Sequence, residues 1–347
     1  MYEILTDMNV LYDSFKKCKK GVDWKSSMQM YEANLLKNLN DLRKSLLQGT
    51  YKIKSFSEFD INERGKTRHI KSPTIRDRIL QRALCDYILE PCLYPYLIYD
   101  NGASIKGKGV EFTRNRLDKH LRNYYSKYGN KGYILVGDFS KFFDSIPHDK
   151  LIKSLRLHIK DEKVMQLLEH IINSFNPEEK KGLGIGSQIS QICGVYYPTP
   201  IDNYCKIVKQ CKYYARHMDD FYIIHNDKEF LKKLLCDITE LANELGLALN
   251  EKKTHIYRID KGFPFLKQFV FVTDTGEIVH KPCKKNVVRE RRKLKSFKKK
   301  LDNGEMKIED ILICYKSWRG NMKKYNCYYT IKNMDGLFYQ LFKMKVR

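Results

Sequence analysis

The chain has 347 residues, of which 42% are hydrophobic and 12% aromatic, a composition typical of a packed globular protein. Sixty-five Lys and Arg residues against 41 Asp and Glu residues give a formal net charge of +24, spread along the whole chain, which favours nucleic acid over a membrane surface as the partner. Because the sequence has no run of about 18 apolar residues, no signal-like N-terminus and no CxxC pair, we expect a cytoplasmic protein without a membrane span or a zinc site.

The spacing of apolar residues predicts the elements in chain order. Residues three and four apart are apolar in several segments, which predicts helices over 27–48, 75–89, 164–175 and 230–245, and a basic helix over 284–300. Alternation of polar and apolar residues predicts a hairpin over 51–71 with a basic tip. A short buried strand over 133–136 leads directly into Asp138. The order of these elements indicates an α+β protein.

A second hairpin, over 213–224, is predicted by an apolar and aromatic run that only Met218, Asp219 and Asp220 interrupt at its centre. An Asp-Asp pair alone is more often a solvated turn, but such a turn rarely lies inside so apolar a run. With Asp138 at the end of another strand, the sequence offers carboxylates for two Mg²⁺ ions, for which Mn²⁺ can substitute. The backbone carbonyl of Phe139 is a further candidate ligand.

In the segments around these aspartates the chain resembles the reverse transcriptase family. The segment 215–220 is similar to the family's Tyr-x-Asp-Asp box, with His217 in place of Tyr, and the segment 136–146 is similar to its first catalytic motif. The resemblance covers about residues 51 to 340. It implies a right-hand polymerase fold (fingers, palm and thumb) with a palm β-sheet backed by helices and a helical thumb, and an RNA-directed DNA polymerase that binds template RNA, the RNA–DNA hybrid and dNTPs.

The same resemblance divides the chain into domains. It implies an N-terminal helical extension (1–50), fingers (51–130), a palm (131–270, with some contribution to the fingers around 150–185) and a basic helical thumb (271–347). The segment 76–84 resembles a helix of group II-intron-type enzymes, in which Asp77 fits a structural role as well as a functional one.

Further site residues follow from the matched motifs. By resemblance to the fingers hairpin, Lys66 and Arg68 contact the incoming triphosphate, where point charges and a guanidinium fork suit phosphate oxygens. Phe143, five residues after Asp138, occupies the position of the aromatic gate that excludes a 2′-hydroxyl. Lys253, or alternatively Lys252, matches the lysine that protonates the pyrophosphate leaving group.

Two features near the C-terminus match parts that hold the nucleic acid. The segment 262–266 resembles the primer grip, with Phe265 and Leu266 as the contacting residues and Lys267 where the family usually has Gly. The basic run beyond it resembles the thumb helix that follows the hybrid backbone, although a charge run elsewhere is usually a solvated face. Its candidate contacts are Arg289, Arg292, Lys295 and Lys299.

The segment 184–191 discriminates between kinds of reverse transcriptase. Ile185, Gly186 and Gln191, beside the nascent base pair in the family, belong to a pattern that resembles the enzymes of diversity-generating retroelements, whose cDNA is mutated chiefly at template adenines. An apolar Ile185 removes a polar contact and with it part of the selectivity. This resemblance implies a small basic accessory-variability protein as a partner. Two alternatives stay open: a phage-defence or other bacterial reverse transcriptase with a noncoding RNA, and a catalytically silent RNA-binding scaffold.

Overall fold

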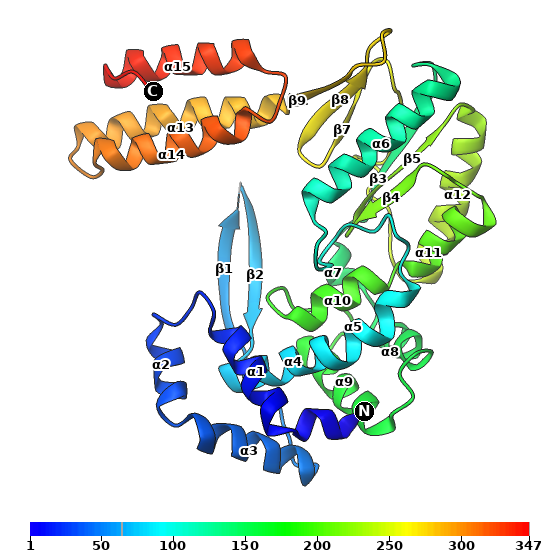
Figure 1. Ribbon diagram of the computed structural model, residues 1–347, viewed down its shortest axis with the longest axis vertical. Coiled ribbons are helices and arrows are strands. Elements are labelled where there is room, and N and C mark those ends of the chain that lie inside the picture. The colour runs from blue at the N-terminus through cyan, green and yellow to red at the C-terminus, as the bar shows by residue number, and fades with distance from the viewer. Residues whose placement is uncertain (64, 347) are drawn as a thin grey trace. The chain divides into compact units, whose positions relative to one another are not determined.

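The computed structural model describes residues 1–63 and 65–346, apart from the side chains of Glu63 and Lys66 (Figure 1). The chain forms two compact units. The first consists of Met1–Thr113, Gly137–Phe221 and Lys233–Lys252, and the second of Arg114–Val136, Tyr222–Lys232 and Lys253–Arg347. None of the described helices is long and apolar enough to cross a membrane.

The first unit opens with a 3₁₀ turn and helices. They are η1 (Tyr2–Thr6), α1 (Met8–Lys19), α2 (Ser26–Ala33) and α3 (Leu35–Leu47). The single helix predicted over 27–48 is therefore wrong, because the chain breaks at Asn34, whose φ and ψ are −121° and 36°. The side-chain amide of Asn38 donates to the carbonyl of Tyr31 at 2.9 Å and so takes the place of a helical N–H there.

The hairpin predicted over 51–71 is confirmed, although its first strand begins only at Ser57, and Arg64 of the predicted basic tip lies outside the described residues. Strands β1 (Ser57–Glu63) and β2 (Lys66–Ser72) pair antiparallel, with Glu63 opposite Lys66. The helix predicted over 75–89 continues further than expected, first as α4 and then with a change of winding. The segment comprises α4 (Ile75–Leu84), the π-helical turn η2 (Cys85–Leu89), α5 (Glu90–Leu93) and the 3₁₀ turn η3 (Tyr94–Tyr96).

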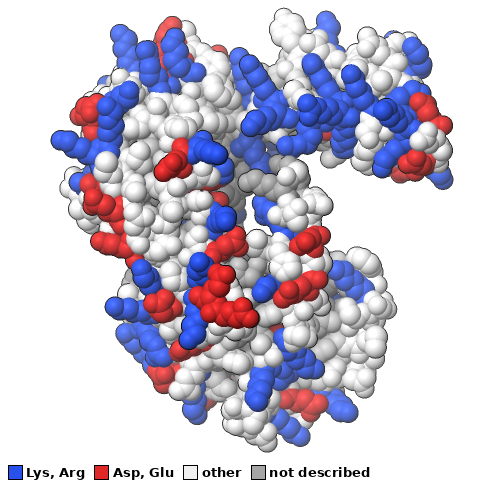
Figure 2. All heavy atoms as spheres, turned by 180° about the vertical axis from the view of Figure 1, so that it is seen from behind, with Lys and Arg blue, Asp and Glu red and all other residues white. Residues whose placement is uncertain are grey.

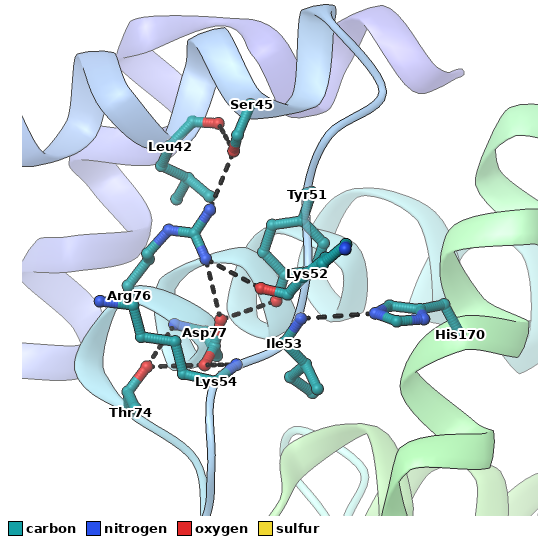
Figure 3. A network of polar contacts seen from close by, with 10 residues as sticks. All are labelled: Leu42, Ser45, Tyr51, Lys52, Ile53, Lys54, Thr74, Arg76, Asp77 and His170. Carbon is teal, nitrogen blue, oxygen red and sulfur yellow. Dashed lines mark hydrogen bonds and ion pairs between the residues drawn. The ribbon is translucent and has the colours of Figure 1, made fainter.

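The buried carboxylate of Asp77 fastens the start of α4 to the chain that precedes the hairpin (Figure 3). It accepts hydrogen bonds from the Tyr51 hydroxyl at 2.7 Å and from the Lys54 backbone N–H at 3.2 Å. The Thr74 hydroxyl donates to it at 2.6 Å, while Thr74 also caps the helix. These bonds satisfy the buried charge locally and give Asp77 a structural role.

The central sheet has four strands in the order β4-β5-β3-β6. Its strands are β3 (Tyr133–Asp138), β4 (Tyr214–His217), β5 (Asp220–His225) and β6 (His255–Arg258). The hairpin predicted over 213–224 and the strand before Asp138 are thus confirmed. The helices between and around these strands are α6 (Val110–Tyr128), α7 (Phe142–Ser145), α8 (His148–Arg156), α9 (Glu162–Phe175), α10 (Gln188–Tyr196), α11 (Thr199–Asn203), the π-helical turn η4 (Tyr204–Val208) and α12 (Lys228–Glu244).

The C-terminal part of the second unit combines a small sheet with three helices (Figure 1). The antiparallel sheet contains β7 (Phe263–Phe265), β8 (Gln268–Val272) and β9 (Ile278–Pro282), followed by α13 (Lys284–Asp302), α14 (Ile308–Met322) and α15 (Tyr328–Phe342). The helices share a buried core in which Tyr315 stacks on Phe338 with ring centroids 4.6 Å apart. The predicted basic helix is confirmed as α13.

Candidate active site

Asp138, the last residue of β3, is only 4% exposed and is bonded on both sides. On one side the backbone N–H of Asn250 donates to the Asp138 carbonyl at 2.7 Å, and the Asn250 side-chain amide donates to the carboxylate at 3.1 Å. On the other side the N–H of Phe139 donates to the carbonyl of Asp219 at 3.2 Å. This bond places the Asp219 turn beside the end of β3, as the sequence predicted.

The geometry of the next residue decides where its carbonyl points. Phe139 lies opposite Leu249 in an antiparallel bridge, and the hydrogen bonds to that segment are made by residues 138 and 140. Phe139 and Leu249 are therefore a non-hydrogen-bonded pair, in which both backbone groups of each residue point away from the partner. Since the Phe139 N–H binds Asp219, the Phe139 carbonyl faces the Asp219 side as well.

The donor set suits a hard divalent cation. Within the described ranges, no group of three or more His, Cys, Asp or Glu side chains could hold a metal ion. The chain instead offers the carboxylates of Asp138 and Asp219 and the carbonyl of Phe139, with Asp220 as the first residue of β5. Mg²⁺ in phosphate-transferring sites is bound by one or two carboxylates, with substrate phosphates and waters supplying the remaining ligands. The residues present fit such an ion.

The turn before Asp219 is held by a buried ion pair that sequence analysis did not single out. Arg216 and Asp202 are both fully buried, and their closest N–O distance is 2.6 Å. Arg216 also donates to the carbonyls of Met218 at 2.9 Å and Val195 at 2.8 Å. Burial alone would lower the pKa of Arg216, but the Asp202 carboxylate outweighs it and raises that pKa. The signal in the sequence was a guanidinium inside an apolar run, which must find a partner.

Met218 itself has a left-handed backbone, with φ of 60°. Such a conformation is unusual for a residue other than glycine. The guanidinium bond to its carbonyl therefore supports the turn that presents Asp219.

A glycine next to Asp138 makes room for an aromatic ring. A Cβ atom at Gly137 would lie 2.1 Å from Cζ of Phe221, a distance at which no side chain fits. The Phe221 ring lies with its centroid 5.8 Å from that of Phe139 and is 1% exposed. Gly137 is thus required by the packing beneath the site.

Phe143, the predicted gate residue, lies close to the same turn. A Cβ atom at Gly194 of α10 would lie 3.0 Å from the Phe143 ring and 3.4 Å from Sδ of Met218. One backbone position therefore borders both side chains. Phe143 is half-buried and makes an edge contact with Phe142, with ring centroids 5.4 Å apart.

The segment with Ile185 is fastened to the basic hairpin. The carbonyl of Ile185 accepts a hydrogen bond from the N–H of Lys71, in β2, at 3.0 Å. Gly186 has φ of 116°, and a Cβ there would lie 3.1 Å from the Ile70 side chain. Gln191 is exposed on α10. Ile185 and Gly186 thus lie together at the base of the hairpin.

The predicted triphosphate contacts belong to the same hairpin. Arg68 is exposed on β2, whereas the side chain of Lys66 lies outside the described part of the structure. His69 bonds to Asp60 at 2.9 Å and to Glu58 at 3.0 Å, and these contacts raise the pKa of its imidazole. The face of the hairpin that carries Glu58, Asp60 and His69 is accordingly polar, whereas Phe59 and Ile61 on β1 are exposed apolar residues.

The second unit contains the other predicted residues. Lys253 is exposed just before β6, and Phe265 is buried in β7. Leu266 and Lys267 form a two-residue loop with φ of 44° and 66°, so the turn is tight even though Lys replaces the usual Gly. The Arg114 side chain donates to the Leu266 carbonyl at 2.8 Å and fixes this turn.

The predicted nucleic-acid contacts on α13 are all exposed, and Lys and Arg gather over the C-terminal helices (Figure 2). They are Arg289, Arg292, Lys295 and Lys299.

A strand-end aspartate joined to an aspartate-bearing hairpin, in a mixed fold with helical C-terminal elements, is the arrangement expected of a right-hand polymerase. Residues 54–285, more than half of the chain, match the family profile described as reverse transcriptase (RNA-dependent DNA polymerase). The chain belongs to this family, which confirms the resemblance seen in its motifs.

Two individual proteins are similar to the chain. Protein YkfC of Escherichia coli is 26% identical over 282 residues, which cover 68% of this chain and 72% of YkfC. The putative COX1/OXI3 intron 1 protein of Saccharomyces cerevisiae is 24% identical over 279 residues, or 63% of this chain and 32% of that protein. The chain thus spans about a third of the length of this yeast relative.

Solved structures agree with the predicted fold class. Telomerase from Candida albicans, in complex with a TWJ fragment of telomeric RNA, matches 90% of this chain and 62% of its own with a TM-score of 0.53 and 12% identity. Apo telomerase from Candida tropicalis, truncated from the C-terminal domain, matches 65% of this chain and 55% of its own with a TM-score of 0.50 and 16% identity. At such identities the likeness concerns the fold, and the right-hand polymerase fold is confirmed.

Proposed function

We propose that the chain copies an RNA template into DNA by two-metal nucleotidyl transfer at Asp138 and Asp219. The observation that carries the proposal is the 3.2 Å hydrogen bond from the Phe139 N–H to the Asp219 carbonyl, which joins the two carboxylate-bearing segments. When bound, two Mg²⁺ ions lower the pKa of the primer 3′-hydroxyl and stabilise the triphosphate and its leaving group. The Asn250 amide holds the Asp138 carboxylate in one orientation.

Other residues select and position the substrates in this proposal. Phe143, which like Met218 borders the backbone of Gly194, blocks a 2′-hydroxyl on the incoming nucleotide. Lys66 and Arg68 bind its triphosphate, and Lys253 gives a proton to the pyrophosphate.

The nucleic acid is held by parts of the second unit. The turn at Phe265 and Leu266 positions the primer end, and the exposed cations of α13 follow the phosphates of the RNA–DNA hybrid, which is recognised by shape and backbone. The proposed domain bounds are those of the sequence: fingers over 51–130, palm over 131–270 and thumb over 271–347.

The test separates catalysis from RNA binding. Asp219→Asn is expected to reduce primer extension by about 10³-fold or more, the equivalent of several kcal/mol of transition-state stabilisation, with filter retention of RNA nearly unchanged. Asp149→Asn, a change of an exposed aspartate on α8, serves as the charge-matched control. If wild type and Asp219→Asn extend equally poorly with Mg²⁺ and with Mn²⁺, the chain is an RNA-binding scaffold instead.

Within the family, we propose the error-prone enzyme of a diversity-generating retroelement, working with a template-repeat RNA and a small basic accessory-variability protein. The half-buried apolar side chain of Ile185 supports this, because the bond of its carbonyl to Lys71 fixes it at the base of the hairpin. Ile185→Gln adds one neutral hydrogen bond of roughly 1 kcal/mol and is expected to lower misincorporation at template adenines about fivefold. Sequencing of cDNA made on the cognate RNA measures this misincorporation frequency. Equal error rates at all template bases, unchanged in the variant, would favour another bacterial reverse transcriptase acting with a noncoding RNA.

A further inference from the structure

A cavity of about 550 Å³ lies where β9, α13 and α15 meet, within the second unit. Its walls are fastened to each other, because the N–H of Asn326 donates to the His280 carbonyl at 2.8 Å and the His280 N–H donates to the Asn326 side chain at 3.0 Å. The volume falls within the range of ordinary ligand sites. Two walls of the cavity, β9 and the segment just before α15, are thus joined directly.

The lining of this cavity is cationic. Lys281, Lys284 and Arg291 contribute to it, and none of the residues that line it is acidic. Both α13 and α15 begin at the cavity, at Cys283 and Cys327, and neither helix start has a side-chain cap. Helix N-termini carry partial positive charge and unsatisfied N–H groups, so they add to the attraction of the side chains for an anion.

The rim of the cavity is aromatic. Tyr328 and Tyr329 are 70% and 76% exposed, and their rings meet edge to face with centroids 5.4 Å apart. Exposed aromatic rings beside cations suit unpaired bases, which stack on the rings while the cations bind the phosphates.

The cavity differs in position from the surface of α13 proposed for the hybrid. Its α13 residues (284, 287, 288 and 291) lie in the first two turns of the helix. The hybrid-facing residues (289, 292, 295 and 299) extend further along the helix and are centred about a quarter of a turn away, with Lys295 alone continuing the cavity stripe. A paired duplex buries its base faces and cannot stack on Tyr328 and Tyr329. The two surfaces therefore suit two different segments of nucleic acid.

We infer that this cavity binds an unpaired strand of nucleic acid, with phosphates at Lys284 and Arg291 and bases on Tyr328 and Tyr329. The strand is template RNA or newly made DNA, which share this chemistry. The site does not depend on catalysis, so it can be tested in EDTA without nucleotides.

The experiment measures fluorescence anisotropy of the full chain with an oligouridine RNA, an oligothymidine DNA and a blunt RNA–DNA hybrid. Tyr328→Ala/Tyr329→Ala is expected to weaken single-strand binding roughly 10- to 100-fold, since stacking contributes about 1–3 kcal/mol per base. Hybrid binding is expected to change less than about threefold. Tyr339→Ala, which alters an exposed tyrosine of the same helix outside the cavity, is the matched control.

A second variant tests the phosphate contacts. Lys284→Gln/Arg291→Gln should reduce the slope of log affinity against log salt by about 1.4 for the single strand, or about 0.7 per phosphate contact. Preference for the RNA or the DNA probe identifies the strand. Unchanged single-strand binding in both variants, or an equal loss for strand and hybrid, overturns the inference, provided that circular dichroism shows folded proteins.

Discussion

Replacing Arg216 by Met removes the cation of the buried ion pair behind the Asp219 turn. Asp202 is then left fully buried, with the Tyr214 hydroxyl still donating to its carboxylate at 2.5 Å. Breaking a buried pair by removing one partner costs about 3–5 kcal/mol. The carbonyl of Met218 also loses its donor, so the loss of stability is expected to be concentrated in β4 and β5.

Hydrogen exchange of peptides that cover 214–225, followed by mass spectrometry, measures this loss as a fall in the free energy of opening. The double variant Arg216→Met/Asp202→Asn removes the unpaired charge and is expected to recover at least about 1.5 kcal/mol. Arg258→Met is the control, because Arg258 makes a similar fork to Asp260 on the surface, where an ion pair contributes little. An effect of Arg216→Met no larger than that of Arg258→Met, or a double variant as unstable as the single one, refutes the reasoning.

Two further substitutions and one labelling experiment test other parts of the molecule. Lys267→Gly should raise the free energy of unfolding by about 1 kcal/mol, because it relieves a left-handed backbone at φ of 66°, and a lower urea midpoint would contradict this. Phe143→Ala should increase incorporation of ribonucleotides relative to deoxynucleotides in primer extension, and an unchanged ratio would argue against a gate. Burial raises the pKa of the Cys193 thiol to about 12. Iodoacetamide at neutral pH should therefore alkylate the exposed Cys236 and leave Cys193 unmodified in the native protein. Peptide mass spectrometry of protein labelled in the folded state measures this, and labelling of both cysteines would disprove it.

Local patterns in the sequence were sufficient for most elements of the fold. The helices predicted over 164–175 and 230–245 lie at 162–175 and 228–244, and both hairpins were predicted as well, because amphipathic spacing and turn residues depend on positions close together in the sequence. The break at Asn34 was missed because it depends on a side chain of the following helix, Asn38, which competes for a backbone carbonyl. The change to π-helical winding at 85–89 has no comparable local signal.

The candidate site, like the fold, contains some features that the sequence predicted and others that it did not. The approach of Asp138 to the Asp219 turn was predicted from motifs, since Asp138 closes a recognisable strand and Asp219 lies in the turn of a recognisable hairpin. The partners that hold the site, Asn250 and Asp202, were not predicted, because each pairs with a residue distant in the sequence. At Lys267 the sequence departs from the family pattern, which favours Gly there, but the loop is nonetheless tight.

Gly137 and Phe221 are far apart in the chain but occupy one volume, since the ring fills the space that a side chain at 137 would need. Neither position can change freely while the other is kept. Random mutagenesis that varies one codon at a time should find both sites intolerant, whereas libraries that randomise the two codons jointly should recover small-for-large exchanges. In alignments of close homologues, the two columns should therefore covary.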